Sequence, residues 1–265
     1  MNETTGFCLN LTSYQPDKDL LKGRNILITG AGDGIGRALA IGVARHGATV
    51  ILLGRTVKKL EAVYDEIEAA GGPQPAIYPL DIEKAPTEAF DQLGNVLAQN
   101  FPQLDGLIHN AAILGSHTPM VLTEPQIWQR VMQTNLTAPY LITRSCHQLL
   151  KAAPSAALIF TSDAVAQHGR AYWGAYSVAK AGLDNLMQIL ADEWENNTNI
   201  RVNSLDPGPV HTWLRRLAFP GENPDTLATP EDCLPPFLYL LDGQQAASRG
   251  QRLRWDRQAF SLSVI

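Results

Sequence analysis

Short apolar runs alternate with segments of helical periodicity along most of the chain. Residues 25–29 form an apolar run that ends at Gly30, and apolar side chains then recur every three or four positions from Ile35 until Gly47. Residues 48–53 are a continuous apolar run, too short for a helix and typical of a strand buried on both faces of a parallel sheet. This order predicts a strand, a turn, a helix and a second strand.

The same alternation continues along the rest of the sequence. Further strands are predicted at residues 76–80, 105–109, 158–160, 201–205 and 252–255, and helices at residues 57–70, 88–99, 124–150, 183–194 and 231–241. Strands separated by helices predict right-handed crossovers between parallel strands. The pattern therefore indicates the α/β class.

The hydrophobic pattern predicts one domain. Residues 1–21 are expected to form an irregular N-terminal leader, and residues 22–265 a single domain without internal repeats. Five prolines between Pro207 and Pro230 interrupt any long element. Because such stretches near strand ends often bind substrates, we expect a substrate loop at residues 207–230.

Composition indicates a globular protein and excludes several partners. Of the 265 residues, 45% are hydrophobic and 18% charged, and the net charge of -5 provides no basic stripe for a nucleic acid. No apolar run approaches the roughly 20 residues of a membrane span, and the N-terminus lacks the pattern of a signal peptide. Cys8, Cys146 and Cys233 are too widely spaced to indicate a disulfide framework or a metal site. We therefore expect a cytoplasmic protein with no nucleic acid, membrane or metal partner.

The segment TGAGDGIG lies between the first predicted strand and the first predicted helix. Gly30, Gly34 and Gly36 permit a tight turn and the close approach of a pyrophosphate, whose charge is favoured by the N–H groups and dipole of a helix N-terminus. The segment predicts a dinucleotide-binding turn that includes Asp33 and Ile35, with a merely structural turn as the alternative.

The end of the second predicted strand indicates which nucleotide is bound. An acid in this region would bond to the ribose of NAD, whereas an arginine would meet the 2′-phosphate of NADP. Gly54 leaves space and Arg55 supplies a guanidinium fork, with Lys58 and Lys59 as candidate helpers. Asp33 opposes this interpretation because it puts negative charge inside the turn. The sequence favours NADP(H), with NAD(H) as the alternative.

Tyr176 and Lys180 of the segment YSVAK share one helical face because they stand four residues apart. A phenol ionises near pH 10, so a nearby ammonium must lower its pKa before it exchanges protons near neutrality. The two residues are candidates for general acid–base chemistry, and an ordinary surface pair is the alternative.

Several motifs occur in one fixed order. They are TGAGDGIG, HNAA at residues 109–112, Asn135, YSVAK at residues 176–180 and PGPVHT at residues 207–212. Together they resemble the short-chain dehydrogenase/reductase family, over a stretch from about Lys22 to Trp255. GR at residues 169–170, WGAY at residues 173–176 and FP at residues 219–220 resemble a bacterial subgroup of short-chain reductases of unassigned substrate.

The resemblance implies a fold and an assembly. The fold is a single Rossmann-like, doubly wound parallel sheet of about seven strands with helices on both faces. The assembly is a homodimer or homotetramer, formed through the long helices near Glu124 and Trp173.

The resemblance also implies roles for individual residues. The tyrosine that matches Tyr176 exchanges a proton with the substrate oxygen while hydride moves between nicotinamide and carbon. The lysine that matches Lys180 binds the nicotinamide ribose and lowers the tyrosine pKa, and the asparagine that matches Asn135 holds a water in a proton relay. The implied cofactor-binding residues are Gly30, Asp33, Gly34, Ile35, Gly36, Arg55, Asp81, Ile82, Asn110, Ala111, Tyr176, Lys180, Pro207, Gly208, Val210 and Thr212.

One position departs from the family pattern. The family's catalytic serine stands thirteen residues before the tyrosine, and 176 - 13 = 163 is Asp163 in this chain. An ionised aspartate cannot donate a hydrogen bond to a carbonyl, and its charge opposes ionisation of Tyr176. Three interpretations follow: a dry pocket keeps Asp163 protonated, a bulge brings Ser162 into the site, or catalysis is impaired.

The leading functional hypothesis is NADP(H)-dependent interconversion of a carbonyl and an alcohol of a small molecule. The competing hypothesis is a nucleotide-binding protein with weak or no turnover, a redox sensor or interaction module. Within the substrate loop, four residues are candidates for an apolar lid over the nicotinamide. Two arginines are candidates for binding an anionic substrate. The lid residues are Trp213, Leu214, Leu217 and Phe219, and the cationic pair is Arg215 and Arg216.

Overall fold

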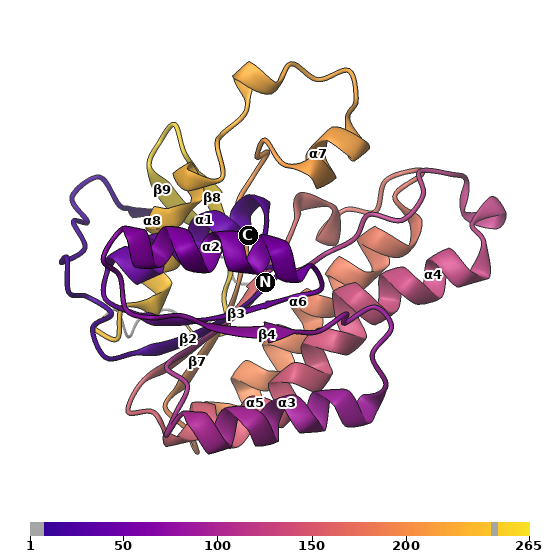
Figure 1. The fold of residues 1–265 in the computed structure, drawn as a ribbon. Helices are drawn as coiled ribbons and strands as arrows, with labels where there is room; N and C mark the ends of the chain where they lie inside the picture. The colour runs from indigo at the N-terminus through magenta and orange to yellow at the C-terminus, as the bar shows by residue number, and fades with distance from the viewer. Residues whose placement is uncertain (1–7, 245–248) are drawn as a thin grey trace.

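The computed structural model describes residues 8–244 and 249–265. Its centre is one nine-stranded sheet with the strand order β1-β9-β8-β7-β6-β5-β2-β3-β4 (Figure 1). The strands are β1 Cys8–Asn10, β2 Asn25–Thr29, β3 Thr49–Gly54, β4 Ala76–Pro79, β5 Gly106–His109, β6 Ala156–Thr161, β7 Ile200–Asp206, β8 Arg252–Asp256 and β9 Ser261–Val264.

The seven strands from β2 to β8 are parallel, as the alternation of strands and helices predicts. The expected count of about seven is wrong by two, because β9 adds to β8 and β1 adds to β9, both antiparallel. Part of the segment expected to be an irregular leader is thus a strand, and Leu11 and Leu21 after it are fully buried. Residues 1–7 of that segment lie outside the described part of the chain.

Helices cover both faces of the sheet. They are α1 Gly34–Arg45, α2 Val57–Ala69, α3 Thr87–Asn100, α4 Pro125–Met132, α5 Ala138–Ala152, α6 Gly174–Trp194, α7 Trp213–Ala218 and α8 Leu234–Leu241. Figure 1 shows α1, α2 and α8 on one face and α3, α5 and α6 on the other. The expected long helix at residues 124–150 is present as α4 and α5, joined by a π-helical turn at Gln133–Thr137. In the described part of the chain, no helix is both long and apolar enough to cross a membrane.

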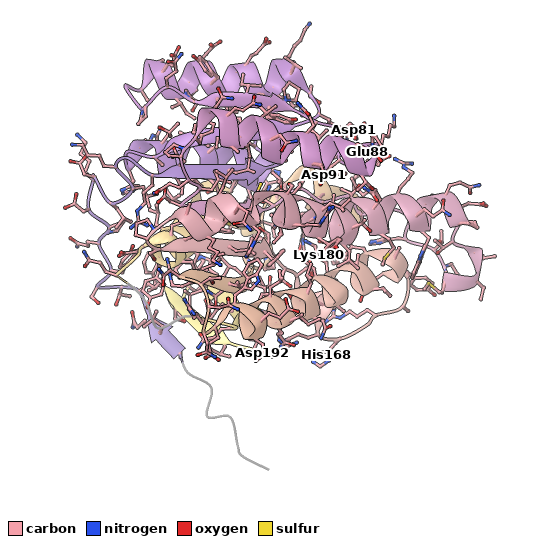
Figure 2. The ribbon with its side chains drawn as sticks, turned by 90° about the horizontal axis from the view of Figure 1, so that it is seen from below. Asp81, Glu88, Asp91, His168, Lys180 and Asp192 are labelled. Carbon is pink, nitrogen blue, oxygen red and sulfur yellow. The ribbon has the colours of Figure 1, made fainter. Side chains whose placement is uncertain are left out.

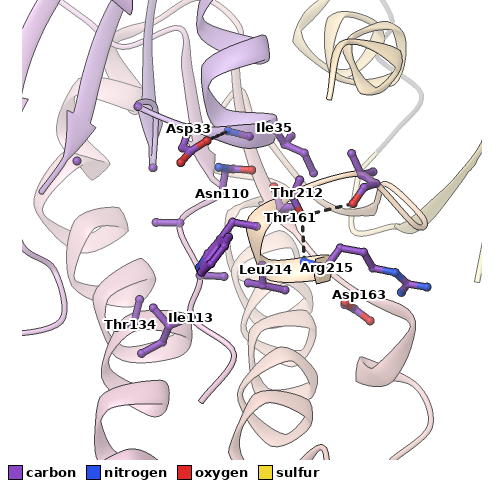
Figure 3. A pocket seen from close by; sticks show the side chains of 18 of the residues that line it. Asp33, Ile35, Asn110, Ile113, Thr134, Thr161, Asp163, Thr212, Leu214 and Arg215 are labelled. Carbon is purple, nitrogen blue, oxygen red and sulfur yellow. Dashed lines mark hydrogen bonds between the residues drawn. The ribbon is translucent and has the colours of Figure 1, made fainter. Parts of the chain in front are cut away.

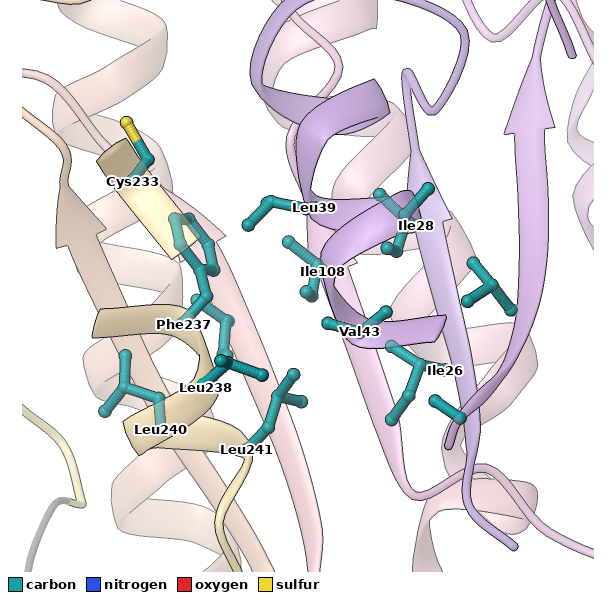
Figure 4. Packing of buried hydrophobic residues seen from close by; sticks show 14 of the residues in the cluster. Ile26, Ile28, Leu39, Val43, Ile108, Cys233, Phe237, Leu238, Leu240 and Leu241 are labelled. Atoms are coloured by element: carbon teal, nitrogen blue, oxygen red, sulfur yellow. The ribbon is translucent and has the colours of Figure 1, made fainter. Parts of the chain in front are cut away.

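Alternate residues of the buried strands supply the two hydrophobic layers, since neighbours on a strand point to opposite faces. Ile26 and Ile28 of β2 pack with α1 and α8, whereas Leu27 packs with α3, α5 and α6. Figure 4 shows Phe237 and Leu238 of α8 facing the side of α1 that carries Leu39. This packing fixes the first helix against the strands whose carboxyl ends surround the site.

The expected substrate loop at residues 207–230 contains the short helix α7 and a 3-10 turn at Pro224–Thr226. Figure 1 shows this segment projecting beyond the sheet on the side of α7. Thr212 begins α7 by accepting a hydrogen bond from the backbone N–H of Arg215. The loop therefore places α7 over the carboxyl ends of the strands.

Candidate active site

A cavity of about 370 Å³ opens at the carboxyl ends of the parallel strands. This is the edge at which open α/β sheets bind ligands. Most of the site residues expected from the sequence line it: Gly30, Asp33, Gly34, Ile35, Arg55, Asp81, Ile82, Asn110, Ala111, Ser162, Asp163, Tyr176, Lys180, Pro207, Gly208, Val210 and Thr212. Figure 3 shows Asp33, Ile35 and Asn110 near the start of α1 and Asp163 farther along the cavity. Gly36 and Asn135 do not line the cavity.

The glycine-rich turn is closely packed. Gly30 has a φ of +69°, a conformation that favours glycine. A Cβ on Gly36 would lie 2.2 Å from the carbonyl oxygen of Gly30, so a side chain there would push α1 away from the turn. The absence of these side chains brings the backbone itself to the cavity.

Asp33 caps the N-terminus of α1 by accepting a hydrogen bond from the N–H of Gly34. Its other oxygen lies 2.5 Å from Nζ of Lys59, and this contact lowers the pKa of the Asp33 carboxyl. Both side chains are more than half exposed. Lys59 therefore offsets the negative charge that Asp33 places in the turn.

Arg55 follows β3 and is held near a buried acid. Glu83 is only 6% exposed, and it accepts a hydrogen bond at 2.6 Å from Nε of Arg130. Its Oε2 atom lies 3.8 Å from the guanidinium of Arg55 and has no hydrogen-bond partner. Arg55 itself is 64% exposed and lines the cavity, so its guanidinium is accessible to a ligand.

The segment after β5 is hydrogen-bonded to β2. Thr29 Oγ1 accepts hydrogen bonds from the backbone N–H groups of Asn110 and Ala111 at 3.0 and 3.1 Å. The Asn110 side chain donates to the carbonyl of Thr29. Asn110 and Ala111 are thereby fixed beside the glycine-rich turn.

Asn135 lies in the π-helical turn between α4 and α5. Its amide donates to the carbonyl of Ile113 at 2.8 Å, and its carbonyl accepts from the N–H of Ile113 at 2.9 Å. Single π turns inside α-helices are frequent at functional sites. The side chain holds the cavity wall at Ile113 in place, and the water relay implied by the family resemblance stays a prediction.

Tyr176 and Lys180 are both almost fully buried on α6. The phenol of Tyr176 donates a hydrogen bond to Oδ2 of Asp163 at 3.2 Å, and Nζ of Lys180 donates to the carbonyl of Thr161 at 2.6 Å. Their burial excludes an ordinary surface pair.

The sequence predicts two opposite effects on the pKa of Tyr176, a lowering by Lys180 and an increase by Asp163. Burial raises its pKa well above 10, and the charges of Asp163 and Asp206 and the hydrogen bond to Asp163 raise it further. Burial lowers the pKa of Lys180, and the charges of Asp163, Asp184 and Asp206 act against this shift. The expected lowering of the tyrosine pKa by Lys180 is outweighed, because desolvation and two carboxylates act against it.

Asp163 accepts hydrogen bonds at both carboxyl oxygens. Its Oδ1 accepts from the N–H of Val165 at 3.0 Å, and its Oδ2 accepts from Tyr176. These two bonds fix the orientation of the Asp163 side chain beside the phenol of Tyr176. The interpretation in which a dry pocket keeps Asp163 protonated stays a prediction.

Ser162 does not enter the site through a bulge. The ladder between β6 and β7 is regular from Ala156 to Thr161, and the N–H of Ser162 continues it by donating to Leu205. The Ser162 hydroxyl forms a hydrogen bond with the carboxyl of Asp184. Burial raises the pKa of this carboxyl, and the hydrogen bond offsets part of the increase. The expected bulge is therefore absent, and Ser162 lines the cavity from a regular strand end.

The far end of the cavity is aromatic. Trp173 lies with its ring centroid 5.8 Å from Tyr176 and 5.7 Å from Phe219. Trp213, Leu214 and Phe219 line the cavity as the lid hypothesis expects, whereas Leu217 is 52% exposed and lies outside it. The loop thus contributes only part of the expected lid.

The expected cationic pair is largely engaged within the protein. Two nitrogens of Arg215 donate to the two carboxylate oxygens of Glu222, each at 2.6 Å. Arg216 lies over the ring of Trp213 at 4.7 Å. Arg215 is therefore neutralised within its own loop and is not a free anchor for an anionic substrate.

Comparison with known proteins identifies the family. The profile described as short chain dehydrogenase matches residues 24–223, which is most of the chain. The chain belongs to the short-chain dehydrogenase family. It is 44% identical over 237 residues to the uncharacterized oxidoreductase YciK of Escherichia coli K12, covering 89% of this chain and 93% of YciK.

Two solved structures of short chain dehydrogenases are similar over nearly their whole length. One, from Shigella flexneri 2a in complex with NADP, is 42% identical with a TM-score of 0.87 and covers 91% of this chain and 100% of that chain. The other, from Escherichia coli CFT073 in complex with NADPH, is 43% identical with a TM-score of 0.87 and covers 92% and 100%. The Rossmann-like fold expected from the sequence is confirmed.

Three residues of this short-chain dehydrogenase site were missed by the sequence analysis. Glu83 and Trp173 line the cavity, and so does Asp206, which is 3% exposed and accepts from the N–H of Gly208. The position of Asp206 directly before the expected cofactor residues Pro207 and Gly208 was a usable signal. Glu83 carries no such signal, because only tertiary packing brings it to Arg55.

Proposed function

We propose that the protein is an NADP(H)-dependent oxidoreductase that interconverts a carbonyl and an alcohol of a small molecule. The observation that carries the proposal is the Tyr176 phenol, which lies buried in the cavity wall near Lys180 and within hydrogen-bond distance of Asp163. Membership of an oxidoreductase family supports the proposal.

The glycine-rich turn fits a dinucleotide. Positions 30 and 36 have no room for a side chain, and α1 begins there, so its N-terminal N–H groups and dipole suit a pyrophosphate. Asp81, Ile82 and Asn110 are proposed to hold the adenosine half, and Lys180 and Thr212 the nicotinamide half. When bound, the nicotinamide supplies or accepts the hydride.

The residues at the end of β3 favour NADP(H) over NAD(H). Arg55 is accessible at the cavity edge, and Lys59 compensates the charge of Asp33. The similar proteins in complex with NADP and NADPH support the same choice. Glu83 acts against this preference, because its buried carboxylate attracts the guanidinium of Arg55.

Tyr176 suits the direction of reduction. Because its pKa is raised by burial and by Asp163, the phenol is protonated at physiological pH. A protonated phenol can give its proton to the substrate oxygen, whereas alcohol oxidation requires the phenolate. Reduction is therefore proposed as the working direction.

Two further expectations belong to this proposal. A cytoplasmic location is supported by the free thiols of Cys8, Cys146 and Cys233. A homodimer or homotetramer is supported by the exposed apolar side chains of Tyr140 on α5 and of Val178 and Ile189 on α6. Light scattering would then give a multiple of the 28.9 kDa chain mass, and a mass of one chain would contradict the assembly.

The direct test is NADPH consumption over a panel of diketones and quinones. The natural protein should turn over at least one of them, and Tyr176→Phe should lower that rate by about 100-fold or more. Asp163→Ser, which restores a hydroxyl donor, is measured beside them. Turnover by Asp163→Ser alone would favour the competing nucleotide-binding function, and failure of every variant to bind NADPH would contradict the proposal.

A further inference from the structure

We infer that the site prefers a planar cyclic iminium ion, a protonated C=N bond, over a neutral ketone. The inference rests on the proposed hydride transfer at this cavity and concerns the class of substrate. It is carried by the carboxylate of Asp163, which takes part in no salt bridge within the described residues, and by the aromatic rings at the far end of the cavity.

The first step is the group that Asp163 presents. Its Oδ2 lies 3.2 Å from the Tyr176 hydroxyl, so it faces the place where the substrate heteroatom must reach the phenol. Its Oδ1 is occupied by the N–H of Val165, which fixes the orientation of the carboxylate. A carbonyl oxygen can only accept hydrogen bonds and is repelled there, whereas the N–H of an iminium ion donates a charge-assisted bond.

The second step is the charge around Asp163. The salt bridges found in the described part of the chain do not include Asp163. Nζ of Lys180 donates to the neutral carbonyl of Thr161, so its charge acts on Asp163 without a salt bridge, whereas Arg215 is bound at two nitrogens by Glu222. Asp206 also lines the cavity, but it is paired with Arg254, whose Nε lies 3.6 Å from Oδ2. The carboxylate of Asp163 is therefore the one left to pair with a cationic ligand.

The third step is the shape of the far end. Trp173 lies 5.7 Å from Phe219 and 5.8 Å from Tyr176, with the rings tilted by 45° and 49°. The guanidinium of Arg215 already lies 3.8 Å from the centre of the Phe219 ring. Aromatic faces such as that of Trp173 attract cations and bury flat apolar rings. A planar ring system with one charged nitrogen therefore matches both the rings and Asp163.

The proton balance favours the same class. Hydride from NADPH forms a C–H bond at the iminium carbon, the π pair of C=N becomes the nitrogen lone pair, and NADPH is oxidised to NADP+. The product is a neutral amine, so no proton leaves Tyr176. A ketone would become an alkoxide that must take this proton, which leaves a phenolate beside Asp163. Only the second reaction draws a proton from Tyr176 and leaves two negative charges side by side.

Binding without added nucleotide tests the inference. The probes are 1,2,3,4-tetrahydroisoquinoline, which is protonated at neutral pH, and isochroman, its neutral ether counterpart, measured by titration calorimetry. We expect the natural protein to bind the amine about tenfold or more tightly than the ether. Asp163→Asn and Asp163→Ser should remove most of this preference. Asp192→Asn, which removes a charge from an exposed part of α6, should keep it (Figure 2).

Turnover separates this inference from the proposed function. With NADPH, the natural protein should reduce 3,4-dihydroisoquinoline faster than 1-tetralone, and Asp163→Ser should reverse the order. A natural protein without preference for the amine, or a preference that survives both substitutions of Asp163, overturns the inference. In either case NADPH binding and ketone reduction would still support the proposed function, and their loss in the natural protein would contradict that function instead.

Discussion

The phenol of Tyr176 and the carboxylate of Asp163 form a direct hydrogen bond, with 3.2 Å between Oη and Oδ2. The bond joins the proposed proton donor to the residue that stands where the family has a serine. Because the carboxylate also raises the pKa of the phenol, the proposed direction of catalysis and the proposed substrate class both depend on this contact.

Alcohol oxidation should depend steeply on pH. It requires the Tyr176 phenolate, and the pKa of Tyr176 is raised well above 10, first by burial and then by Asp163. Its rate should therefore rise about tenfold per pH unit without a plateau below pH 10. Asp163→Asn removes one cause of the shift, so its profile should move to lower pH, while that of Asp192→Asn stays in place. A profile unchanged by Asp163→Asn would show that the carboxylate does not act on the phenol.

Arg55→Ala should weaken NADPH binding about 10- to 100-fold, because charge-assisted bonds to the 2′-phosphate are lost. NADH binding should change little, since NADH has no phosphate at this position. Fluorescence titration with both nucleotides measures the difference, and Arg45→Ala is the matched control, as Arg45 is exposed at the end of α1 and does not line the cavity. Equal losses for the two nucleotides would refute the assignment of NADP(H).

Gly36→Ala should disrupt the glycine-rich turn. The added Cβ would lie 2.2 Å from the carbonyl oxygen of Gly30, so α1 or the turn must shift. We expect a loss of about 1–3 kcal/mol in the free energy of unfolding and at least tenfold weaker NADPH binding. Gly221→Ala, where a Cβ meets no atom within 4 Å, is the control for both measurements. Full retention of NADPH binding would argue against a dinucleotide at this turn.

His109 should make the protein less stable in acid. It is buried, bonded to Thr143 and stacked on Phe160, and burial lowers its pKa to about 3. In the unfolded chain, His109 takes up a proton below about pH 6.5. Between about pH 6.5 and 3 the unfolded state therefore binds more protons than the folded state, and the free energy of unfolding falls as the pH falls. At about pH 5 this costs about 2 kcal/mol relative to neutral pH.

Urea unfolding at both pH values, for the natural protein and for His109→Asn, measures this contribution. The substitution removes the titrating group, so its loss of stability in acid should be smaller by about the same 2 kcal/mol. His147, whose pKa burial also lowers, is common to both proteins and cancels in the comparison. Identical pH dependence for the two proteins would exclude a buried neutral His109 as the cause.

Most elements of the fold were predictable from the sequence, because their signals are local. The apolar run of β3 and the three-and-four repeat of α1 depend on residues a few positions apart. The added strands were not predictable in this way, since β1 and β9 are short and pair across almost the whole length of the chain. Their pairing is decided by the edge that β8 leaves open.

The sequence by itself determined the parallel α/β architecture, the glycine-rich turn and the shared helical face of Tyr176 and Lys180, because each follows from backbone geometry over a few residues. Only the tertiary structure decided what surrounds these residues. It brings Asp206 into the cavity with Tyr176, Glu83 to Arg55, and Trp173 to Phe219. Burial and the meeting of such charges set the pKa of a side chain, and both arise only when segments far apart in the sequence pack together.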